Sequence, residues 1–561
     1  MENFVPKKPR RSRNRPVWLT RRVIQLTRQK KSKFKTYCQN RSPENLSEYK
    51  KIEKKCRREV RNAKKQFEKK VSQKTNDRSF NSYLKSKMKC RTGVGPLKIN
   101  NNIIINDQEI AATLNSYFSS VFNTNNGTGE MNSEPISEHE LNDIEFDIGD
   151  IKKVIYNMKI GPSGPDNISV KFIKTFENEV SGPLFKIFQK SLSSGQVPND
   201  WKLANVTPIF KKGNKSDPSN YRPVSLTCVV CKIMESLIKS RIVNFFDQHS
   251  LLKRSQHGFL KGRSCCTNLL EFFEKVTKLF DEGKPVDIIY LDLCKAFDKV
   301  PFKRLLLSVK KLGVKGRILM WLEAWLTGRQ QRVVLNGKFS DWLSVLSGIP
   351  QGSVLGPLLF LVFINDLDDA AIIIDLISKF ADDTKLCKAV QSEEDRAALQ
   401  HVLDNLTGWA ESTGMSFNVT KCKVLHVGNT NKRYEYKVNG SNLTSVETEK
   451  DLGVRYISSL KPGSQCSEAA RSANFVLGQI CRNFHYRDKE VFLNLYKRYV
   501  RVHLEYCTPA WNPWLSKDIE VLEKVQMRAV KQIQGLQATT YNARLQELNL
   551  PTLTERRHRY D

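Results

Sequence analysis

The pattern of apolar and polar positions predicts a chain of interleaved helices and strands. Val206–Phe210 and Val333–Leu335 are short runs rich in β-branched residues, which is typical of strands. Leu399–Trp409 and Val491–Val500 have the apolar spacing of helices. Such elements recur from Ile144 to about Ile533 with no regular βαβ repeat. The pattern therefore predicts an α+β architecture.

Two adjacent carboxylates, Asp382 and Asp383, interrupt this pattern. They lie between the apolar run Ile372–Ile377 and the stretch Thr384–Leu386, which predicts a β-hairpin with the aspartates at or beside its turn. Neighbouring carboxylates repel each other unless a cation lies beside them. Because aspartate is also common in solvated turns, the dipeptide alone favours an ordinary turn.

A third carboxylate follows a strand that is apolar nearly throughout. Val286–Leu293 reads as a buried strand that ends with Asp292. A carboxylate in this position needs a partner, but it could equally cap a helix that begins near Lys295. Ser347–Ser353 is a loop rich in Gly and Pro, which either lets the backbone approach a ligand or forms a plain turn.

Taken together, these segments predict a metal site. A hairpin with two acids beside a strand end with one acid would place three carboxylates around one point. Hard oxygen ligands of this kind suit two Mg²⁺ ions, which often keep substrate phosphates in their coordination shells. A pair of metal ions can activate a 3′-hydroxyl and stabilise the leaving oxygen in phosphoryl transfer.

The charge of the chain points to an anionic partner. Lys and Arg number 92 against 58 Asp and Glu, a net charge of +34. Residues 1–91 hold 31 basic and 7 acidic residues and so carry +24 of this charge. Stretches such as Tyr49–Arg58 predict partly packed basic helices that bind phosphates without reading sequence, or else a solvated charge run. Met1–Arg15 is expected to be disordered, and Lys7–Arg11 also fits a nuclear import signal.

Several classes of protein are disfavoured. The longest apolar run, Val354–Ile364, is too short to cross a bilayer and reads as a buried helix, so no membrane partner is expected. The N-terminus has no apolar signal core, and the 13 scattered cysteines fit a reducing compartment. We therefore expect a nuclear or cytoplasmic protein that is not secreted. Cys228 and Cys231 lie in an apolar helical pattern, which favours core packing over a zinc site.

The segments that carry these residues resemble the ordered motifs of non-LTR (LINE-type) retrotransposon reverse transcriptases, in particular the jockey and CR1-like branches. The similarity extends from about Ile144 to Gly453. The matching motifs are Ile209–Gly213, Asn220–Leu226, Gln256–Phe259, Gly262–Ser264, Tyr290–Pro301, Gly348–Pro357, Phe380–Asp383, Asn418–Lys421 and Tyr436–Val454.

The resemblance implies a right-hand polymerase with fingers, an antiparallel-sheet palm and a helical thumb. Its domains would be a basic extension that binds nucleic acid (1–91), a linker segment (92–143), fingers and palm (144–455) and a truncated thumb-like region (456–561). The implied activity is RNA-directed DNA synthesis, with an RNA template, a DNA primer or target and dNTPs. Mg²⁺ would be the cofactor, with Mn²⁺ as a substitute. The oligomeric state stays open.

The resemblance also assigns roles to single residues. Asp292, Asp382 and Asp383 would be the catalytic metal ligands, with Asp382 a firmer ligand than Asp383. Arg222 would hold the incoming triphosphate, assisted by one of the neighbouring lysines Lys211 and Lys212.

Four further residues would complete the nucleotide site. Phe297 would exclude a 2′-hydroxyl from the sugar pocket, although a core aromatic is the alternative. Gln351 and Gly352 would pack near the nascent base pair. Lys421 would protonate the pyrophosphate leaving group, or else be an ordinary exposed charge.

Two other functions compete with this interpretation. A catalytically silent RNA-binding relic would use only the basic N-terminus, but the intact aspartates argue against it. An RNA replicase of viral type would share the palm, but Phe297 argues against the use of rNTPs. No endonuclease is expected, because residues 1–91 leave no room for one. We expect the chain to be either a polymerase fragment of a longer element protein or a shortened genomic copy.

Overall fold

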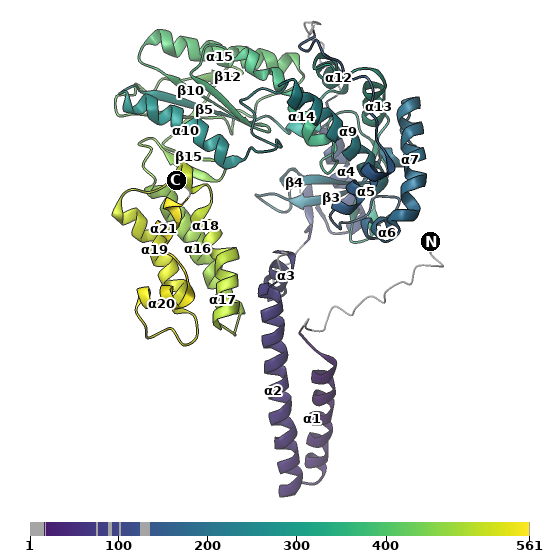
Figure 1. Ribbon diagram of the computed structural model, residues 1–561, viewed down its shortest axis with the longest axis vertical. Helices are drawn as coiled ribbons and strands as arrows, with labels where there is room; N and C mark the ends of the chain where they lie inside the picture. Colours follow the sequence, from purple (N-terminus) through teal and green to yellow (C-terminus); the bar gives the residue numbers. More distant parts are fainter. Residues whose placement is uncertain are drawn as a thin grey trace. The chain divides into compact units, whose positions relative to one another are not determined.

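The computed structural model describes residues 16, 18–73, 77–87, 93–99, 102–123 and 135–559. The chain divides into two compact units (Figure 1). One unit comprises residues 92–461, and the other joins residues 1–91 to residues 462–561. The predicted import signal Lys7–Arg11 and most of the polar stretch 123–134 lie outside the described residues.

A five-stranded sheet organises the unit 92–461. Its central strand β5 (Val286–Leu291) pairs antiparallel with β10 and β11, and the strand order is β14-β11-β5-β10-β9. The side chains of β5 are buried nearly throughout, as the apolar run predicts. The other strands are β9 (Leu376–Phe380), β10 (Asp383–Ala389), β11 (Lys423–Val427) and β14 (Thr444–Val446).

The predicted hairpin is present, but its first strand starts later than the apolar run suggests. β9 begins at Leu376, and Ile372 and Ile373 are 81% and 57% exposed, so they are not strand residues. β9 and β10 pair with Asp383 opposite Phe380, which leaves Ala381 and Asp382 as the two turn residues. A two-residue turn joins antiparallel strands closely and fixes their register.

Helices pack on this sheet or share its apolar core. They are α9 (Val229–Gln248), α10 (Cys265–Asp281), α12 (Phe302–Lys311), α14 (Gly356–Phe363) and α15 (Glu393–Ser412). The run predicted as a buried helix contains α14. Just before this helix, the backbone N–H groups of Val354 and Leu355 donate to the buried carboxylate of Glu235. An acid at this position offsets the unpaired amides and the positive end of the helix dipole.

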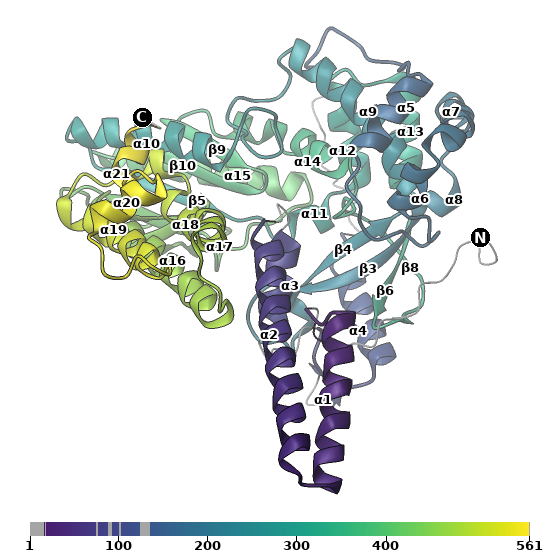
Figure 2. The same cartoon turned by 60° about the horizontal axis from the view of Figure 1, so that its bottom comes forward.

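A second sheet carries the other predicted strands. Its strands are β3 (Leu203–Phe210), β4 (Tyr221–Thr227), β6 (Gln330–Leu335), β7 (Lys338–Phe339) and β8 (Leu343–Ser344). Helix α4 (Asp107–Ser120) lies along this sheet (Figure 2). Its apolar face packs against Val206 and Val333, so this part of the linker and N-terminal segment 92–143 packs into the fold of this unit.

Four further helices pack together in a connected group, and the first of them contacts α9. They are α5 (Ile148–Asn157), α6 (Val170–Thr175), α7 (Glu177–Ser194) and α13 (Gly316–Leu326). Cys228 and Cys231 at the start of α9 are buried in the core, which confirms the packing interpretation.

The second unit is helical and unites the two ends of the chain. Its elements are α1 (Arg21–Gln39), α2 (Pro43–Gln73), α3 (Asp77–Lys87), α16 (Gly463–Asn483), α17 (Lys489–Leu495), α18 (Arg501–Glu505), α19 (Ser516–Lys531), α20 (Tyr541–Leu548) and α21 (Leu553–His558). The helix predicted at Val491–Val500 is α17 followed by a π-helical turn.

Contacts far apart in sequence hold this unit together. The ring of Phe80 in α3 stacks on Tyr499 with a centroid distance of 3.6 Å. The buried carboxylate of Glu68 in α2 accepts hydrogen bonds from the backbone N–H groups of His485 and Tyr486, each at 3.1 Å. The basic N-terminal helices are therefore docked on the C-terminal helices. Among the described residues, no helix is long and apolar enough to span a membrane.

Candidate active site

The three predicted aspartates line one cavity in the unit 92–461. This cavity has a volume of about 950 Å³, and Asp292, Asp382 and Asp383 all contribute to its wall. Six of the seven predicted nucleotide-binding residues line it as well: Lys211, Lys212, Arg222, Phe297, Gln351 and Lys421. Gly352 is the exception.

Strand register explains why the aspartates meet. Thr384 of β10 pairs with Leu291 of β5 in an antiparallel ladder, so Asp383 and Asp292 occupy the same end of neighbouring strands. The turn places Asp382 directly before Asp383. Asp292 does not cap a helix, because the four-residue helix α11 (Ala296–Lys299) begins after Lys295.

Crowding of the carboxylates perturbs their protonation. Burial raises the pKa of Asp383 to about 6, and the charges of Asp382, Asp292 and Asp451 add to the effect. Burial also raises the pKa of Asp382, and the charge of Asp292 adds to that rise, whereas Arg222 and Lys211 oppose it. Buried acids that repel each other in this way are stabilised by a bound cation. The donor set therefore fits a divalent metal ion.

Asp292 is engaged by a lysine in this structure. The ammonium of Lys421 lies 2.5 Å from the carboxylate Oδ2 of Asp292, and Lys421 remains 42% exposed. Within the described residues, no three His, Cys, Asp or Glu side chains are already arranged to hold a metal ion. To bind a metal with the other two carboxylates, Asp292 would have to exchange this lysine for the ion.

A chain of hydrogen bonds orients Arg222. Its Nε donates to Oε1 of Gln351 at 2.5 Å, and Nε2 of Gln351 donates to Oδ1 of Asp298 at 2.7 Å. Burial raises the pKa of Asp298, while the hydrogen bond from Gln351 and the charges of Lys295 and Arg222 oppose that rise. Gln351 thus connects an arginine of β4 to an acid of α11.

Gly352 lies beside the cavity and allows its loop to approach the backbone of β4 closely. Its φ is +129°, and a Cβ at this position would lie 2.4 Å from the carbonyl oxygen of Ser225 in β4. The backbone N–H of Ser225 in turn donates to the carbonyl of Gln351 at 2.8 Å. Only glycine allows this approach, so Gly352 seats the loop that carries Gln351.

Phe297 both packs in the core and faces the cavity. Its ring stacks on Phe360 of α14 with a centroid distance of 4.3 Å and meets the edge of Phe259 at 6.3 Å. These contacts fix the orientation of the ring, while its remaining surface lines the cavity. The two interpretations of Phe297 are therefore compatible.

The two candidate lysines differ in their electrostatic effect. Lys211 lowers the pKa of both Asp382 and Asp383, although the rise caused by burial is larger. Lys212 lines the same cavity and also a neighbouring one of about 400 Å³ with Asp292, Asp383 and Asp451. Of the two lysines, Lys211 is thus the one that ranks among the larger influences on the pKa values of Asp382 and Asp383.

Sequence reasoning missed three residues of this cavity. Lys295, with a φ of +48°, donates to the hydroxyl of Tyr117 at 2.6 Å and lies 4.3 Å from its ring centroid. Tyr117 comes from α4, more than 170 residues earlier in the chain. Asp298 directly follows Phe297 inside the matching motif Tyr290–Pro301, and this position could have identified it as a residue of the site. No pattern in the sequence links Tyr117 to the aspartates.

Comparison with known proteins agrees with this geometry. Residues 209–458 match the family described as reverse transcriptase (RNA-dependent DNA polymerase). The chain is 27% identical over 263 residues to a probable RNA-directed DNA polymerase from transposon X-element of Drosophila melanogaster, covering 46% of this chain and 29% of that protein. It is 28% identical over 315 residues to the RNA-directed DNA polymerase from mobile element jockey of Drosophila melanogaster, covering 54% of this chain and 34% of that protein.

These alignments span about a third of the length of each relative. Among solved structures, apo telomerase from Candida tropicalis, truncated from its C-terminal domain, matches with a TM-score of 0.34 and 11% identity, covering 53% of this chain and 62% of that chain. The matched segment contains all three aspartates of the cavity. Residues 209–458 are therefore similar to reverse transcriptases, and the relatives that the chain resembles are RNA-directed DNA polymerases of Drosophila mobile elements.

Proposed function

We propose that this chain is an RNA-directed DNA polymerase that extends a primer 3′-hydroxyl with dNTPs on an RNA template. The observation that carries the proposal is the cavity in which Asp292, Asp382 and Asp383 meet the basic residues Lys211 and Arg222. Carboxylates on one side and cations on the other are the two sets of groups that phosphoryl transfer requires.

The three aspartates would hold Mg²⁺, for which Mn²⁺ is a substitute. When bound, the metal supplies charge neutralisation for the triphosphate and lowers the pKa of the attacking hydroxyl. Release of Asp292 from Lys421 frees the carboxylate for this role. The freed ammonium then lies at the cavity wall, where it can pair with phosphate oxygens or give a proton to the pyrophosphate leaving group.

Selection of the nucleotide falls to the opposite wall. Arg222, oriented by Gln351, binds the triphosphate, and Lys211 assists because its charge already acts on the catalytic turn. The ring of Phe297, which is fixed by stacking on Phe360, lies against the sugar and excludes a 2′-hydroxyl. Tyr117 and Lys295 close the cavity from the side of α4.

The parts of a right-hand polymerase follow from this site. The sheet β14-β11-β5-β10-β9 is the palm, because it carries the aspartates, and the sheet around β3 and β4 belongs to the fingers, because it carries Arg222. The C-terminal helices 462–561 correspond to the thumb, and the N-terminal helices are part of the same unit.

The basic helix α2 supplies a surface for the nucleic-acid partners, an RNA template and a DNA primer or target. Four exposed cations recur on α2 at spacings of three and four residues, which places them on one face of the helix: Lys51, Lys54, Arg58 and Arg61. A row of this kind follows a phosphate backbone without reading bases. Such a polymerase would act in the nucleus or the cytoplasm.

A primer-extension assay tests the proposal. The purified chain, supplied with primed RNA, Mg²⁺ and dNTPs, is expected to make cDNA, with far less product from rNTPs. RNA binding without incorporation under any metal or primer condition would favour the silent relic instead. Equal use of rNTPs would favour an RNA replicase.

A further inference from the structure

The turn that carries Asp382 has an unusual backbone. Ala381, its first residue, has a φ of +56°, a left-handed conformation that residues with a Cβ rarely adopt. Ala381 is also buried, so solvent does not satisfy its backbone groups. Contacts with the rest of the protein must therefore keep this turn in place.

One side chain supplies these contacts. Oε1 of Gln256 accepts hydrogen bonds from the backbone N–H of Ala381 at 2.9 Å and of Gly258 at 2.7 Å. Nε2 of Gln256 lies 3.4 Å from the carbonyl oxygen of Ala381. The amide of Gln256 thus grips both polar groups of the residue that precedes Asp382. Gln256 is 3% exposed and does not line the aspartate cavity.

The segment around Gln256 is itself fixed to strand β9. The backbone N–H of Lys379 donates to the carbonyl of Ser255 at 2.8 Å, and the N–H of His257 donates to the carbonyl of Lys379 at 2.9 Å. This segment, which belongs to the matching motif Gln256–Phe259, therefore extends the sheet that carries the turn of Asp382. At Gly258 a Cβ would lie 2.4 Å from the Ala381 nitrogen, so the approach of the two backbones requires glycine.

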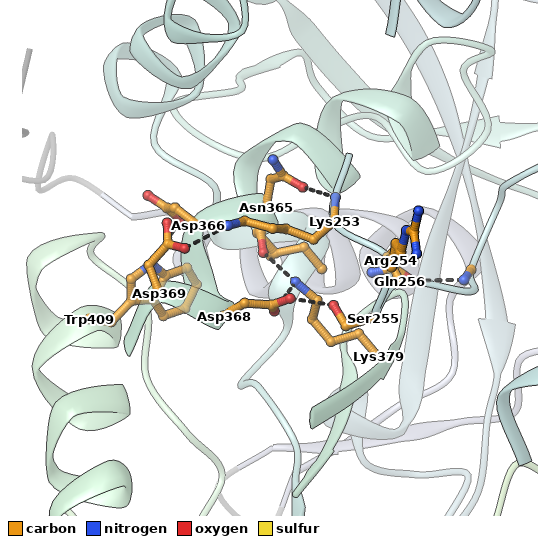
Figure 3. A network of polar contacts seen from close by, with 12 residues as sticks. Lys253, Arg254, Ser255, Gln256, Asn365, Asp366, Asp368, Asp369, Lys379 and Trp409 are labelled. Carbon is orange, nitrogen blue, oxygen red and sulfur yellow. Dashed lines mark hydrogen bonds and ion pairs between the residues drawn. The ribbon is translucent and has the colours of Figure 1, made fainter. Parts of the chain in front are cut away.

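A polar network fixes the residues that precede Gln256 in the chain (Figure 3). Asp368 bonds both the ammonium of Lys379 and the hydroxyl of Ser255, each at 2.5 Å. The side chain of Asn365 accepts from the backbone N–H of Lys253 at 2.9 Å and donates to the carbonyl of Leu251 at 3.0 Å. These bonds are made to residues 251–255 and to Lys379, and none of them reaches Gln256 or the turn.

We propose that Gln256 is a positioning residue that holds Ala381 in its left-handed conformation and so sets the metal-binding geometry of Asp382 and Asp383. The proposal deepens the proposed polymerase function and rests on it. Groups that orient metal ligands through hydrogen bonds contribute roughly 10- to 100-fold to metal affinity. Loss of the Gln256 amide should therefore weaken metal binding more than it weakens binding of RNA.

The test uses the full chain and three variants. Gln256→Met keeps the length of the side chain and removes its hydrogen bonds. Gly258→Ala pushes on the same turn by a different route. Asn365→Leu is the matched control, because it removes two backbone contacts from the same network without touching the turn.

Besides the melting temperature, two quantities are measured for each protein: the affinity for Mn²⁺ by electron paramagnetic resonance without nucleotide, and the Mg²⁺ concentration that gives half-maximal incorporation. Gln256→Met and Gly258→Ala are expected to weaken both by roughly tenfold or more. Asn365→Leu should leave the Mn²⁺ affinity and the half-maximal Mg²⁺ concentration within threefold of wild type, even if its melting temperature falls as much as those of the other two variants.

Two results would overturn the inference. One is metal binding by Gln256→Met within threefold of wild type; the other is a loss in all three variants that simply follows the melting temperature. The Mn²⁺ measurement separates this outcome from failure of the proposed function, because it needs no polymerase activity. Wild-type protein without incorporation would contradict the function alone.

Discussion

The link from Arg222 through Gln351 to Asp298 predicts a selective defect in nucleotide binding. Gln351→Met keeps the length of the side chain but breaks the 2.5 Å bond from Arg222 and the 2.7 Å bond to Asp298. A hydrogen bond with one charged partner contributes about 1.5–3 kcal/mol, and the lower value applies here because Arg222 is exposed to water. Two such bonds at about 1.5 kcal/mol each give about 3 kcal/mol in total, or roughly 150-fold in kcat/KM.

Steady-state incorporation of a single dNTP on primed RNA measures this effect. The loss should fall mainly on the KM for dNTP, because we propose that Arg222 contacts the triphosphate and not the primer. Arg222→Lys is the companion variant, since it keeps the charge but loses the guanidinium Nε that bonds Gln351. A KM for dNTP within twofold of wild type in Gln351→Met would refute the proposed role of the link.

Three further perturbations address other parts of the molecule. Phe297→Ala should improve the use of rNTPs relative to dNTPs by roughly 10- to 200-fold, and an unchanged ratio in competition assays would count against the steric gate. Phe80→Ala removes a buried ring that stacks on Tyr499 and should destabilise the helical unit by about 3–5 kcal/mol. Hydrogen exchange should then accelerate in α2 and α17 but not in β5; uniform protection would contradict the docking. Glutamine is substituted for the four basic residues of α2, which are Lys51, Lys54, Arg58 and Arg61. The slope of log affinity for single-stranded RNA against log salt concentration should then become shallower by about 0.7 per lost phosphate contact. An unchanged slope would exclude this face of α2 as an RNA-binding surface.

Much of the site was predictable because its elements have strong local signals. The strand before Asp292 is apolar nearly throughout, and the two aspartates follow a second strand, so antiparallel pairing brings the three carboxylates to one edge. The limit of the hairpin was less predictable. Ile372 and Ile373 are as apolar as strand residues, yet they lie exposed before β9, since local hydrophobicity does not determine which residues a sheet pairs.

Contacts between distant segments were beyond the reach of the sequence. Tyr117 enters the cavity only because the apolar face of α4 packs on the second sheet. The proposed role of Gln256 depends on the left-handed backbone conformation of Ala381, and an alanine at this position does not predict that conformation. The docking of α3 on the C-terminal helices likewise depends on a stacked pair more than 400 residues apart.

The most direct test of the central claim compares two acids of the same hairpin. Asp382 lies at the turn and lines the cavity, whereas Asp375 lies at the far end, where it accepts from the backbone N–H of Ala389 at 2.7 Å. Extension of primed RNA with dNTPs and Mg²⁺ should be abolished in Asp382→Asn and remain near the wild-type rate in Asp375→Asn. Wild-type activity in Asp382→Asn would contradict the assignment of this cavity as the polymerase active site.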